Sequence, residues 1–358
     1  MILLRKISLY QFRNYNTASF SFDQRITCIT GKNGSGKTNL LDAIYTLCYT
    51  KSYFSATIQP TIMQGKDAYR IEGSFSHRGK EEQVSCTYRN AKKEVSCGGL
   101  VYEKQSEHIG KFAAVMIAPD DIELINEGSE LRRKFIDGIL GQSDRRYLEA
   151  LLQYQKVLAQ RNAWLKMYDN SGKSDQAQLD YYNSLLAEAG TYIFECRKTF
   201  IQTFLPMLQH YYTLLSGGGE QVSVQYQSDL NQHTLQYWLS EHLQHDIRYQ
   251  RTLRGIHKDD LVFLLDGNPI KSYGSQGQKK SFLFSLKLAQ FNYLRSCMQQ
   301  SPLLLLDDVF EKLDQQRMEA LLHIIGDELF GQVVITDTHQ SRINEVFDSA
   351  APVSFIHL

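Results

Sequence analysis

The sequence has no net charge, because 39 lysines and arginines balance 39 aspartates and glutamates over 358 residues. A balanced chain has no global field that would attract nucleic acid, so any such partner must contact a local patch. The chain also lacks a C-x-x-C spacing among its six scattered cysteines. That absence argues against a zinc site and favours free buried thiols in a reducing cytosol.

Long apolar runs are missing as well. The first residues, MILLRKISLYQFRNY, have no extended apolar stretch after the first basic residue, and no later segment is long enough to cross a bilayer. We find no internal repeat and no low-complexity tract. With 42% hydrophobic and 22% charged residues, the composition is typical of a globular protein, and we expect it in the cytoplasm without a membrane partner.

A glycine-rich loop is present near the start of the chain. Residues 31–38 read GKNGSGKT and fit the pattern G-x-x-x-x-G-K-[ST]. A β-rich run precedes the loop and apolar residues at helical spacing follow it, which is the context that a phosphate-binding loop needs. We expect Lys37 to reach the β- and γ-phosphates of ATP and Thr38 to bind Mg²⁺. The residues predicted to bind the nucleotide here are Gly31, Lys32, Asn33, Gly34, Ser35, Gly36, Lys37, Thr38 and Asn39.

A second set of site residues lies near the other end of the chain. The apolar strand Leu303–Leu306 ends in Asp307 and Asp308. We expect Asp307 to hold the magnesium through water and Asp308 to polarise the attacking water beside the γ-phosphate. His339, after the next strand, is a candidate sensor of the γ-phosphate. The alternatives are that the aspartates cap the next helix and that a lone histidine is structural.

A third motif precedes a helix that begins near Lys279. Its residues are Ser275, Gln276, Gly277 and Gln278. A hydroxyl and free N–H groups at a helix start suit a phosphate, although an ordinary helix cap would look the same. Because the glycine loop already surrounds one set of phosphates, we expect this motif to contact the ATP of a partner in a two-fold dimer.

The pattern between these motifs predicts the domain organisation. Alternating segments over about residues 69–101 indicate a β-meander, and two apolar series at helical spacing, over 147–165 and 179–211, indicate an antiparallel helix pair. Strands alternating with helices after residue 300 indicate a mostly parallel sheet. We therefore predict an α/β fold: an ATPase head of mixed sheets and helices from residues 1–120 and 251–358, with a helical arm, residues 121–250, inserted into it.

These motifs are similar to those of the ABC-type ATPases with an SMC/Rad50-like head and, in detail, to the RecF family of bacterial DNA repair proteins. The resemblance covers nearly the whole chain and is weakest at about 60–110 and 165–250. The matching blocks are FRNY at 12–15, GKNGSGKTNLLDAIY at 31–45, PDD at 119–121, RRKFID at 132–137, YQKVLAQRN at 154–162, GIHKDDL at 255–261, SQGQ at 275–278 and LLDDVF at 305–310.

The resemblance implies a function. It implies an ATP- and Mg²⁺-dependent homodimer that hydrolyses ATP slowly and binds double-stranded DNA at gaps or single-/double-strand junctions. It also implies RecO and RecR as partners, help in loading RecA, and roles in replication and the SOS response. Asp314 would contact the nucleotide across the dimer. Glu311 stands where the family usually has serine, and Ile256 where it has proline.

The DNA contacts predicted from the residues themselves are basic pairs. Each pair is equally well explained as a solvated basic face. The candidates are Arg132, Arg133, Arg145, Arg146, Lys279 and Lys280.

Three other classes of protein share part of this pattern. A transporter ATPase would place the SQGQ-like motif much sooner after the glycine loop. A chromosome-structuring or Rad50-like ATPase would separate its two halves by hundreds of residues of heptads. A binding module that uses ATP only as structural support would share the loop but would not hydrolyse ATP.

Overall fold

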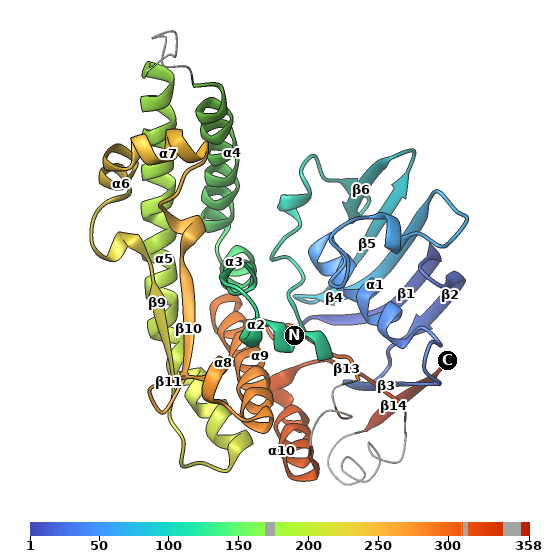
Figure 1. Ribbon diagram of the computed structural model, residues 1–358. Helices are drawn as coiled ribbons and strands as arrows, with labels where there is room; N and C mark the ends of the chain where they lie inside the picture. The colour runs from blue at the N-terminus through green and yellow to red at the C-terminus, as the bar shows by residue number, and fades with distance from the viewer. Residues whose placement is uncertain (169–175, 309, 311–313, 339–351) are drawn as a thin grey trace. The chain divides into compact units, whose positions relative to one another are not determined.

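The computed structural model describes residues 1–168, 176–308, 310, 314–338 and 352–358, and these form two compact units (Figure 1). The first unit, here called the head, contains Met1–Ile122, His210–Gly219 and Ser275–Leu358. The second unit, here called the arm, contains Glu123–Gln209 and Glu220–Gly274.

A parallel five-stranded sheet lies at the centre of the head, in the order β14-β3-β13-β12-β8. All residues of the four strands other than β14 are buried, as expected for strands covered on both faces. The first and last parts of the chain therefore build one sheet, which confirms the prediction of a parallel sheet. The strands are β3 (Ile26–Thr30), β8 (Ala114–Ile117), β12 (Leu303–Leu306), β13 (Val333–Asp337) and β14 (Val353–His357).

A second, antiparallel sheet of the head has the order β2-β1-β4-β5-β6-β7, which confirms the predicted β-meander. Helix α1 (Lys37–Tyr49) contacts strands of both sheets, and its apolar side chains join one core with theirs. This core fixes the helix that follows the glycine loop. The strands are β1 (Leu3–Phe12), β2 (Tyr15–Ser21), β4 (Tyr69–His77), β5 (Lys80–Arg89), β6 (Lys92–Cys97) and β7 (Leu100–Val101).

Two further helices of the head are α9 (Gln276–Met298) and α10 (Gln315–Gly326). Helix α9 packs on edge strand β8 and is attached there by the buried Lys287. Its Nζ lies 3.0 Å from the carbonyl oxygen of Met116 and 3.0 Å from the Asp121 carboxylate. A buried ammonium needs such partners, so this lysine fixes the position of α9 against the sheet.

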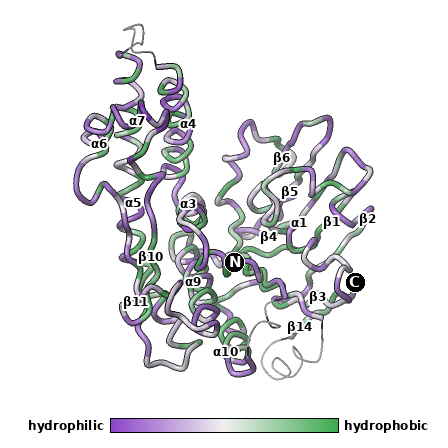
Figure 2. Tube along the Cα trace, viewed as in Figure 1, coloured by the Kyte–Doolittle hydropathy of each residue, from purple (hydrophilic) through white to green (hydrophobic). Residues whose placement is uncertain are grey.

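The arm is built around two long antiparallel helices, α4 (Arg145–Met167) and α5 (Gln176–Ser216). The last residues of α5, from His210 onward, belong to the head. Both helices carry apolar and polar residues along their whole length (Figure 2), as expected for helices buried on one face. The other arm elements are α2 (Glu123–Asn126), α3 (Ser129–Ser143), β9 (Val222–Gln227), α6 (Leu235–Glu241), α7 (Leu243–Tyr249), β10 (Asp260–Leu265), β11 (Asn268–Pro269) and α8 (Ile270–Tyr273).

The boundary between arm and head differs from the one predicted at residue 250. Residues 251–274 lie in the arm, because β10 pairs with β9 in an antiparallel sheet. A hairpin turn follows β10: Asp266 and Gly267 have φ of 47° and 77°, and β11 pairs back on β10. Two successive positive φ values are typical of a type I′ turn. The pairing partner of β10 is distant in sequence, so the periodicity of the chain did not reveal it.

Buried ion pairs hold the arm together, and several come from the blocks quoted above. Arg197 of α5 contacts the carboxylates of Asp137 and Asp259 at 2.8 and 2.9 Å. Arg161 of α4, which is fully buried, contacts Asp246 at 2.7 Å. Removing one partner of such a pair leaves a buried charge unpaired, so these side chains specify how the arm's helices pack.

His257 joins the same polar core. Its Nε2 lies 3.0 Å from the Thr252 carbonyl oxygen, which can only accept, so Nε2 carries the proton. Nδ1 then accepts a hydrogen bond from the Tyr154 hydroxyl at 2.8 Å. Burial lowers the pKa of His257 to about 4. The ring is therefore neutral in the folded arm at ordinary pH.

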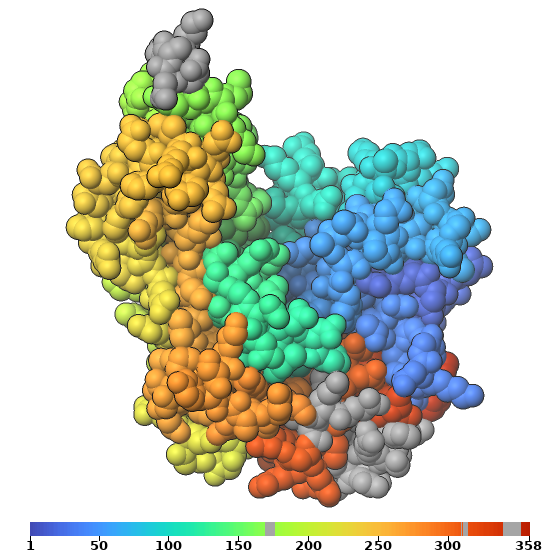
Figure 3. Space-filling view, in the orientation of Figure 1, coloured from blue at the N-terminus to red at the C-terminus, as the bar shows by residue number. Residues whose placement is uncertain are grey.

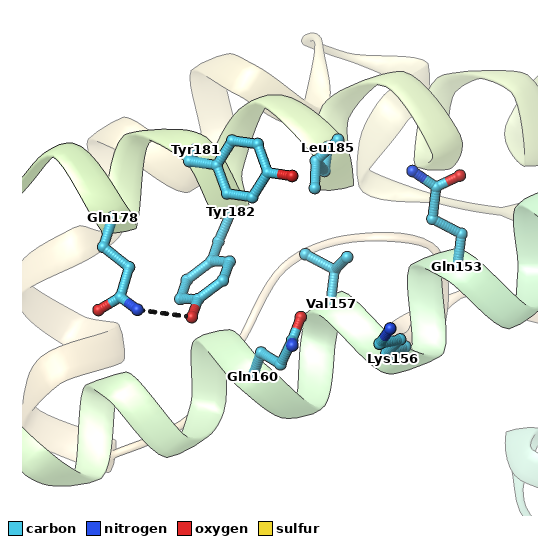
Figure 4. A pocket seen from close by; sticks show the side chains of 8 residues that line it. All are labelled: Gln153, Lys156, Val157, Gln160, Gln178, Tyr181, Tyr182 and Leu185. Atoms are coloured by element: carbon cyan, nitrogen blue, oxygen red, sulfur yellow. Dashed lines mark hydrogen bonds between the residues drawn. The ribbon is translucent and has the colours of Figure 1, made fainter.

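A hollow of about 390 Å³ lies between α4 and α5 (Figure 4). Tyr182 accepts a hydrogen bond from Gln178 at its rim, at 2.9 Å. The residues that line the hollow are Gln153, Lys156, Val157, Gln160, Gln178, Tyr181, Tyr182 and Leu185.

Among the helices that the structure describes, none combines the length and apolar character that a bilayer span requires.

The neutral His257 predicts a pH dependence of arm stability. Below pH 6.5 the unfolded chain binds a proton that the folded arm excludes until about pH 4. The free energy of unfolding should therefore fall by up to about 3 kcal/mol over that interval. Both tryptophans, Trp164 and Trp238, lie in the arm, so urea unfolding followed by tryptophan fluorescence measures this unit.

The variant His257→Asn provides the control. An amide can accept from Tyr154 and donate to Thr252, but it does not titrate. The stability difference between wild type and variant should change between pH 6.5 and pH 4. Parallel curves for the two proteins would show that His257 is not the group responsible.

Candidate functional site

The glycine loop connects β3 to α1 and has the backbone that its sequence predicts. Gly34 and Gly36 have φ of 83° and 113°, a region that residues with a Cβ rarely adopt. A Cβ on Gly36 would also lie 2.7 Å from the Asn14 Nδ2 atom and 2.8 Å from the Tyr15 hydroxyl. Glycine is therefore required at this position for both conformation and space.

The turn between β1 and β2 holds the loop from the side. Asn14 Nδ2 donates to the Ser35 carbonyl oxygen at 3.2 Å, and the Tyr15 hydroxyl donates to the Gly36 carbonyl oxygen at 3.1 Å. Asn39 Nδ2 donates in turn to Asn14 Oδ1 at 2.8 Å. Sequence reasoning identified Asn14 and Tyr15 only as part of a resemblance, because nothing in a single sequence indicates this long-range contact.

The interior of the loop presents groups that suit an anion. Lys37 is buried, and its Nζ donates to the carbonyl oxygens of Gly31 and Lys32 at 2.9 and 3.3 Å. The Ser35 hydroxyl is buried and has no hydrogen-bond partner among the described residues. A buried ammonium and an unpaired donor beside a helix N-terminus fit phosphate oxygens, so these residues are suited to hold the phosphates of a nucleotide.

Thr38 and Asp307 meet although they are far apart in the sequence. The Thr38 hydroxyl lies 3.0 Å from both carboxylate oxygens of Asp307. Thr336, at the end of β13, donates to Asp307 at 3.0 Å and accepts from the Asp308 backbone N–H at 2.9 Å. Hydroxyl and carboxylate oxygens are the ligands that Mg²⁺ prefers. The donor set therefore fits this ion, and Thr336 is a member that sequence reasoning did not assign to the site.

The two aspartates of this cluster have unusual properties: Asp307 has a raised pKa, and Asp308 has a rarely populated backbone conformation. Asp307 is 3% exposed, and burial raises the pKa of its carboxyl to about 6, against the opposing effect of the hydrogen bonds from Thr336 and Thr38. Asp308 has a φ of 43°, which is sparsely populated for a non-glycine residue and typical of functional positions. A nearby cation would stabilise the ionised form of Asp307.

The Ser275 motif begins α9 with a complete capping box. The Ser275 hydroxyl accepts from the Gln278 N–H at 3.2 Å, and the Gln278 side chain accepts from the Ser275 N–H at 2.7 Å. A Cβ on Gly277 would lie 3.1 Å from the guanidinium of Arg317. Arg317 also bonds Ser281 and the side chain of Asp314, the N-cap of α10. The motif is therefore tied to the residue predicted to contact a partner's nucleotide.

The Ser275 motif and the glycine loop belong to different parts of the head. Helix α9 packs on β8, whereas the loop follows β3, and β12 and β13 lie between these strands. At roughly 4.8 Å per strand, β3 and β8 are about 14 Å apart. That a second head completes the nucleotide site stays a prediction.

The basic residues proposed for DNA contact have different environments. Arg132 is buried and forms a two-point ion pair with Asp260 at 2.7 and 3.0 Å. Its guanidinium is therefore not available to contact DNA, contrary to the prediction. Arg133 is half-buried and donates to the Asp259 carbonyl oxygen at 2.7 Å. Arg145 pairs with Glu149, and Arg146 lies 4.4 Å from the ring centroid of Tyr192, both at the exposed start of α4.

Some predicted residues cannot be placed in the site. His339 and Glu311 lie outside the described residues. Lys279 and Lys280 lie in the first turn of α9 and are half-buried. Of the six cysteines, four are buried, whereas Cys196 is half-buried and Cys297 is exposed, so the expectation of buried thiols holds for four of them.

Comparison with known proteins agrees with the geometry. Residues 3–357 match the family model described as the RecF/RecN/SMC N-terminal domain. The chain is 43% identical to the DNA replication and repair protein RecF of Flavobacterium johnsoniae, over 97% of each chain. It is 38% identical to the RecF of Bacteroides thetaiotaomicron, over 96% of this chain and 93% of the other.

Solved structures give the same result. The structure of the recombination mediator protein RecF-ATP in the RecFOR pathway superposes with a TM-score of 0.88 and 29% identity, covering 95% of this chain and 93% of that one. An Smc head domain from Pyrococcus furiosus gives a TM-score of 0.57 at 16% identity, covering 99% of this chain and 93% of that one, and so shares the fold. The loop, the Asp307 strand and these matches over nearly the full length show that the chain belongs to the RecF family of DNA replication and repair proteins.

Proposed function

We propose that this protein is an ATP-dependent DNA-binding ATPase of recombinational gap repair. The observation that carries the proposal is the cluster of Thr38, Asp307, Thr336 and Asp308 beside the glycine loop. It joins a phosphate-binding loop to two carboxylates that directly follow β12, at the edge of the sheet where open α/β sheets bind ligands. A RecF relative solved with ATP supports the choice of nucleotide.

Each residue has a distinct role in this proposal. Lys37 contacts the β- and γ-phosphates, while Thr38 and Asp307 hold Mg²⁺, which neutralises the charge that develops on the phosphates. Asp308 orients and polarises the attacking water. Thr336 fixes the backbone of Asp308 and the carboxylate of Asp307, so both carboxylates are held in place before ATP binds.

We further propose that the active form is a homodimer. The Ser275 motif and Asp314 contact the nucleotide bound by the partner's loop, because they are tied to each other through Arg317 and the motif begins α9, which packs on β8. Hydrolysis is weak, since it requires two heads to close on ATP. A module that binds ATP only for support would keep the loop but would not need Asp308.

The DNA and protein partners follow from the family. We propose binding to double-stranded DNA at gaps or single-/double-strand junctions, with RecO and RecR as partners and RecA loading as the outcome, in the cytoplasm during replication and the SOS response. The name of the RecFOR pathway attached to a solved relative supports this assignment. Candidate phosphate contacts are Arg133, Arg145, Arg146, Lys279 and Lys280.

Complementation tests the shared nucleotide site. Lys37→Ala should abolish ATP binding by its own loop. Ser275→Asp should keep the α9 cap, because aspartate is an equally good N-cap, but should repel a partner's γ-phosphate. Each variant alone should lack ATPase activity. An equimolar mixture should regain about a quarter of wild-type activity, since half of the dimers are mixed and have one intact site of two.

The control for complementation is Ser275→Thr, which keeps both cap and hydroxyl and should retain activity. Phosphate release measures hydrolysis, and ATP-dependent thermal shift confirms that Ser275→Asp still binds ATP. No recovery in the mixture, with both variants folded, would contradict the shared site. ATP binding by Lys37→Ala at wild-type affinity would contradict the role of the loop.

Asp308→Asn separates hydrolysis from binding. The amide cannot accept a proton from water, so the hydrolysis rate should fall about 100-fold or more, while ATP still drives dimer formation. Sedimentation with ATP should show a dimer that persists when the wild-type dimer has dissociated. Asp120→Asn, which alters an exposed aspartate of the same head, is the matched control. If neither the wild type nor Asp308→Asn releases ADP above the protein-free blank, the support module is favoured instead.

A further inference from the structure

A row of aromatic and imidazole rings follows α6 and α7 of the arm. We call His233, Tyr237, Trp238, His242 and His245 the aromatic ladder. Ring centroids are 4.3 Å apart for His233 and Tyr237, 5.5 Å for Tyr237 and Trp238, 5.2 Å for Trp238 and His242, and 5.7 Å for His242 and His245. The rings thus form a continuous series across both helices.

The ladder lies on the outer side of these helices. Leu235 and Leu239 are the buried residues of α6, and Leu243 and Ile247 of α7 pack on a core cluster of the arm. Tyr237 is 43% exposed, and His233 and His245 are exposed as well. In the space-filling view the yellow-to-orange surface formed by residues of α6 and α7 faces solvent (Figure 3). Trp238 and His242 are half-buried.

Two contacts hold the central ring in place. Trp238 Nε1 donates to the Asp229 carbonyl oxygen at 2.9 Å. The guanidinium of Arg254 lies 5.0 Å from the Trp238 ring centroid and 2.7 Å from the Asp229 carboxylate. An indole fixed in this way loses little rotamer freedom when another ring stacks on it.

Exposed charges of both signs lie near the ladder in the sequence: Glu241 of α6, and two arginines near the end of α7. Arg248 and Arg251 are exposed near the C-terminal end of α7, and Tyr249 between them is 55% exposed. The carboxylate of Asp246 is buried in the ion pair with Arg161, so it does not offset these charges at the surface. Exposed rings followed in the sequence by exposed arginines are a combination that suits single strands, because bases stack on rings and guanidinium groups contact phosphates.

We propose that the aromatic ladder and its neighbouring arginines form a binding surface for single-stranded DNA. The site is in the arm and contains none of the nucleotide-site residues, and its assignment to DNA rests on the proposed function. Three of the five rings are imidazoles, and unpaired bases stack on imidazole as they do on tyrosine and tryptophan. Unpaired bases expose the ring faces that such a surface can stack on, whereas those of a duplex are covered.

Intrinsic fluorescence tests the proposal directly on the full-length protein. Trp238 is in the ladder, whereas the second tryptophan, Trp164, is buried. An oligo(dT) of roughly 15 nucleotides, within the range of known single-strand site sizes, should quench the fluorescence and saturate. The affinity should depend on salt, with a slope that falls by about 0.7 in Arg251→Gln for the loss of one phosphate contact.

Ring substitutions separate stacking from charge. The double variant Tyr237→Ala/His245→Ala should bind oligo(dT) at least about tenfold more weakly, while Tyr237→Phe, which keeps the ring, should bind as wild type does. Tyr181→Ala removes another exposed tyrosine of the arm, 61% exposed and outside the ladder, and should have no effect. Urea unfolding of each variant checks that the arm is intact.

The outcomes are distinguishable from those of the proposed function. Absence of quenching in the wild type, or equal oligo(dT) affinity of the folded double variant and the wild type, would overturn the ladder proposal. Neither result would affect ATP-dependent dimer formation or duplex binding, which are measured separately by sedimentation. If the double variant loses oligo(dT) binding but keeps both of those activities, the ladder is a separate site for single strands.

Discussion

The nucleotide site depends on the parallel pairing of β3 with β13 and of β13 with β12. These pairings bring the carboxyl ends of three strands to one edge of the sheet, and each strand delivers part of the site there: the glycine loop, Thr336, and the Asp307–Asp308 pair. Hydrogen bonds between these buried strands fix this alignment. Without it, Thr38 and Asp307 would be separated by most of the chain.

The hydroxyl of Thr336 positions the two aspartates of the site. It donates to one aspartate and accepts from the backbone of the next, so a single buried group sets both carboxylates. Burial also raises the pKa of Asp307 to about 6, and a cation bound beside the carboxyl would favour its ionised form. On the other side of the loop, Asn14 and Tyr15 hold its backbone from the β1–β2 turn. The loop is therefore fixed from both sides by residues outside its own motif.

In the arm, charged side chains form buried ion pairs that hold its helices together. Arg161 and Arg197 are fully buried and paired with carboxylates from distant segments. Breaking such pairs costs more than forming them gains, which suits a unit whose helices must pack in one register. Several blocks that resemble the RecF family, including the one containing His257, contribute to this polar core. The arm's exposed surface is then available for recognition, and α6 and α7 present rings there.

The sequence by itself determined the fold class, the glycine loop, the two aspartates and the helical pair, because each is encoded by local spacing and composition. It could not determine that Arg132 is buried against Asp260, that Thr336 joins the site, or that residues 251–274 belong to the arm. Those outcomes depend on which distant segment a strand or side chain meets. Local periodicity specifies the element and its buried face, but only the packed tertiary structure decides its partner.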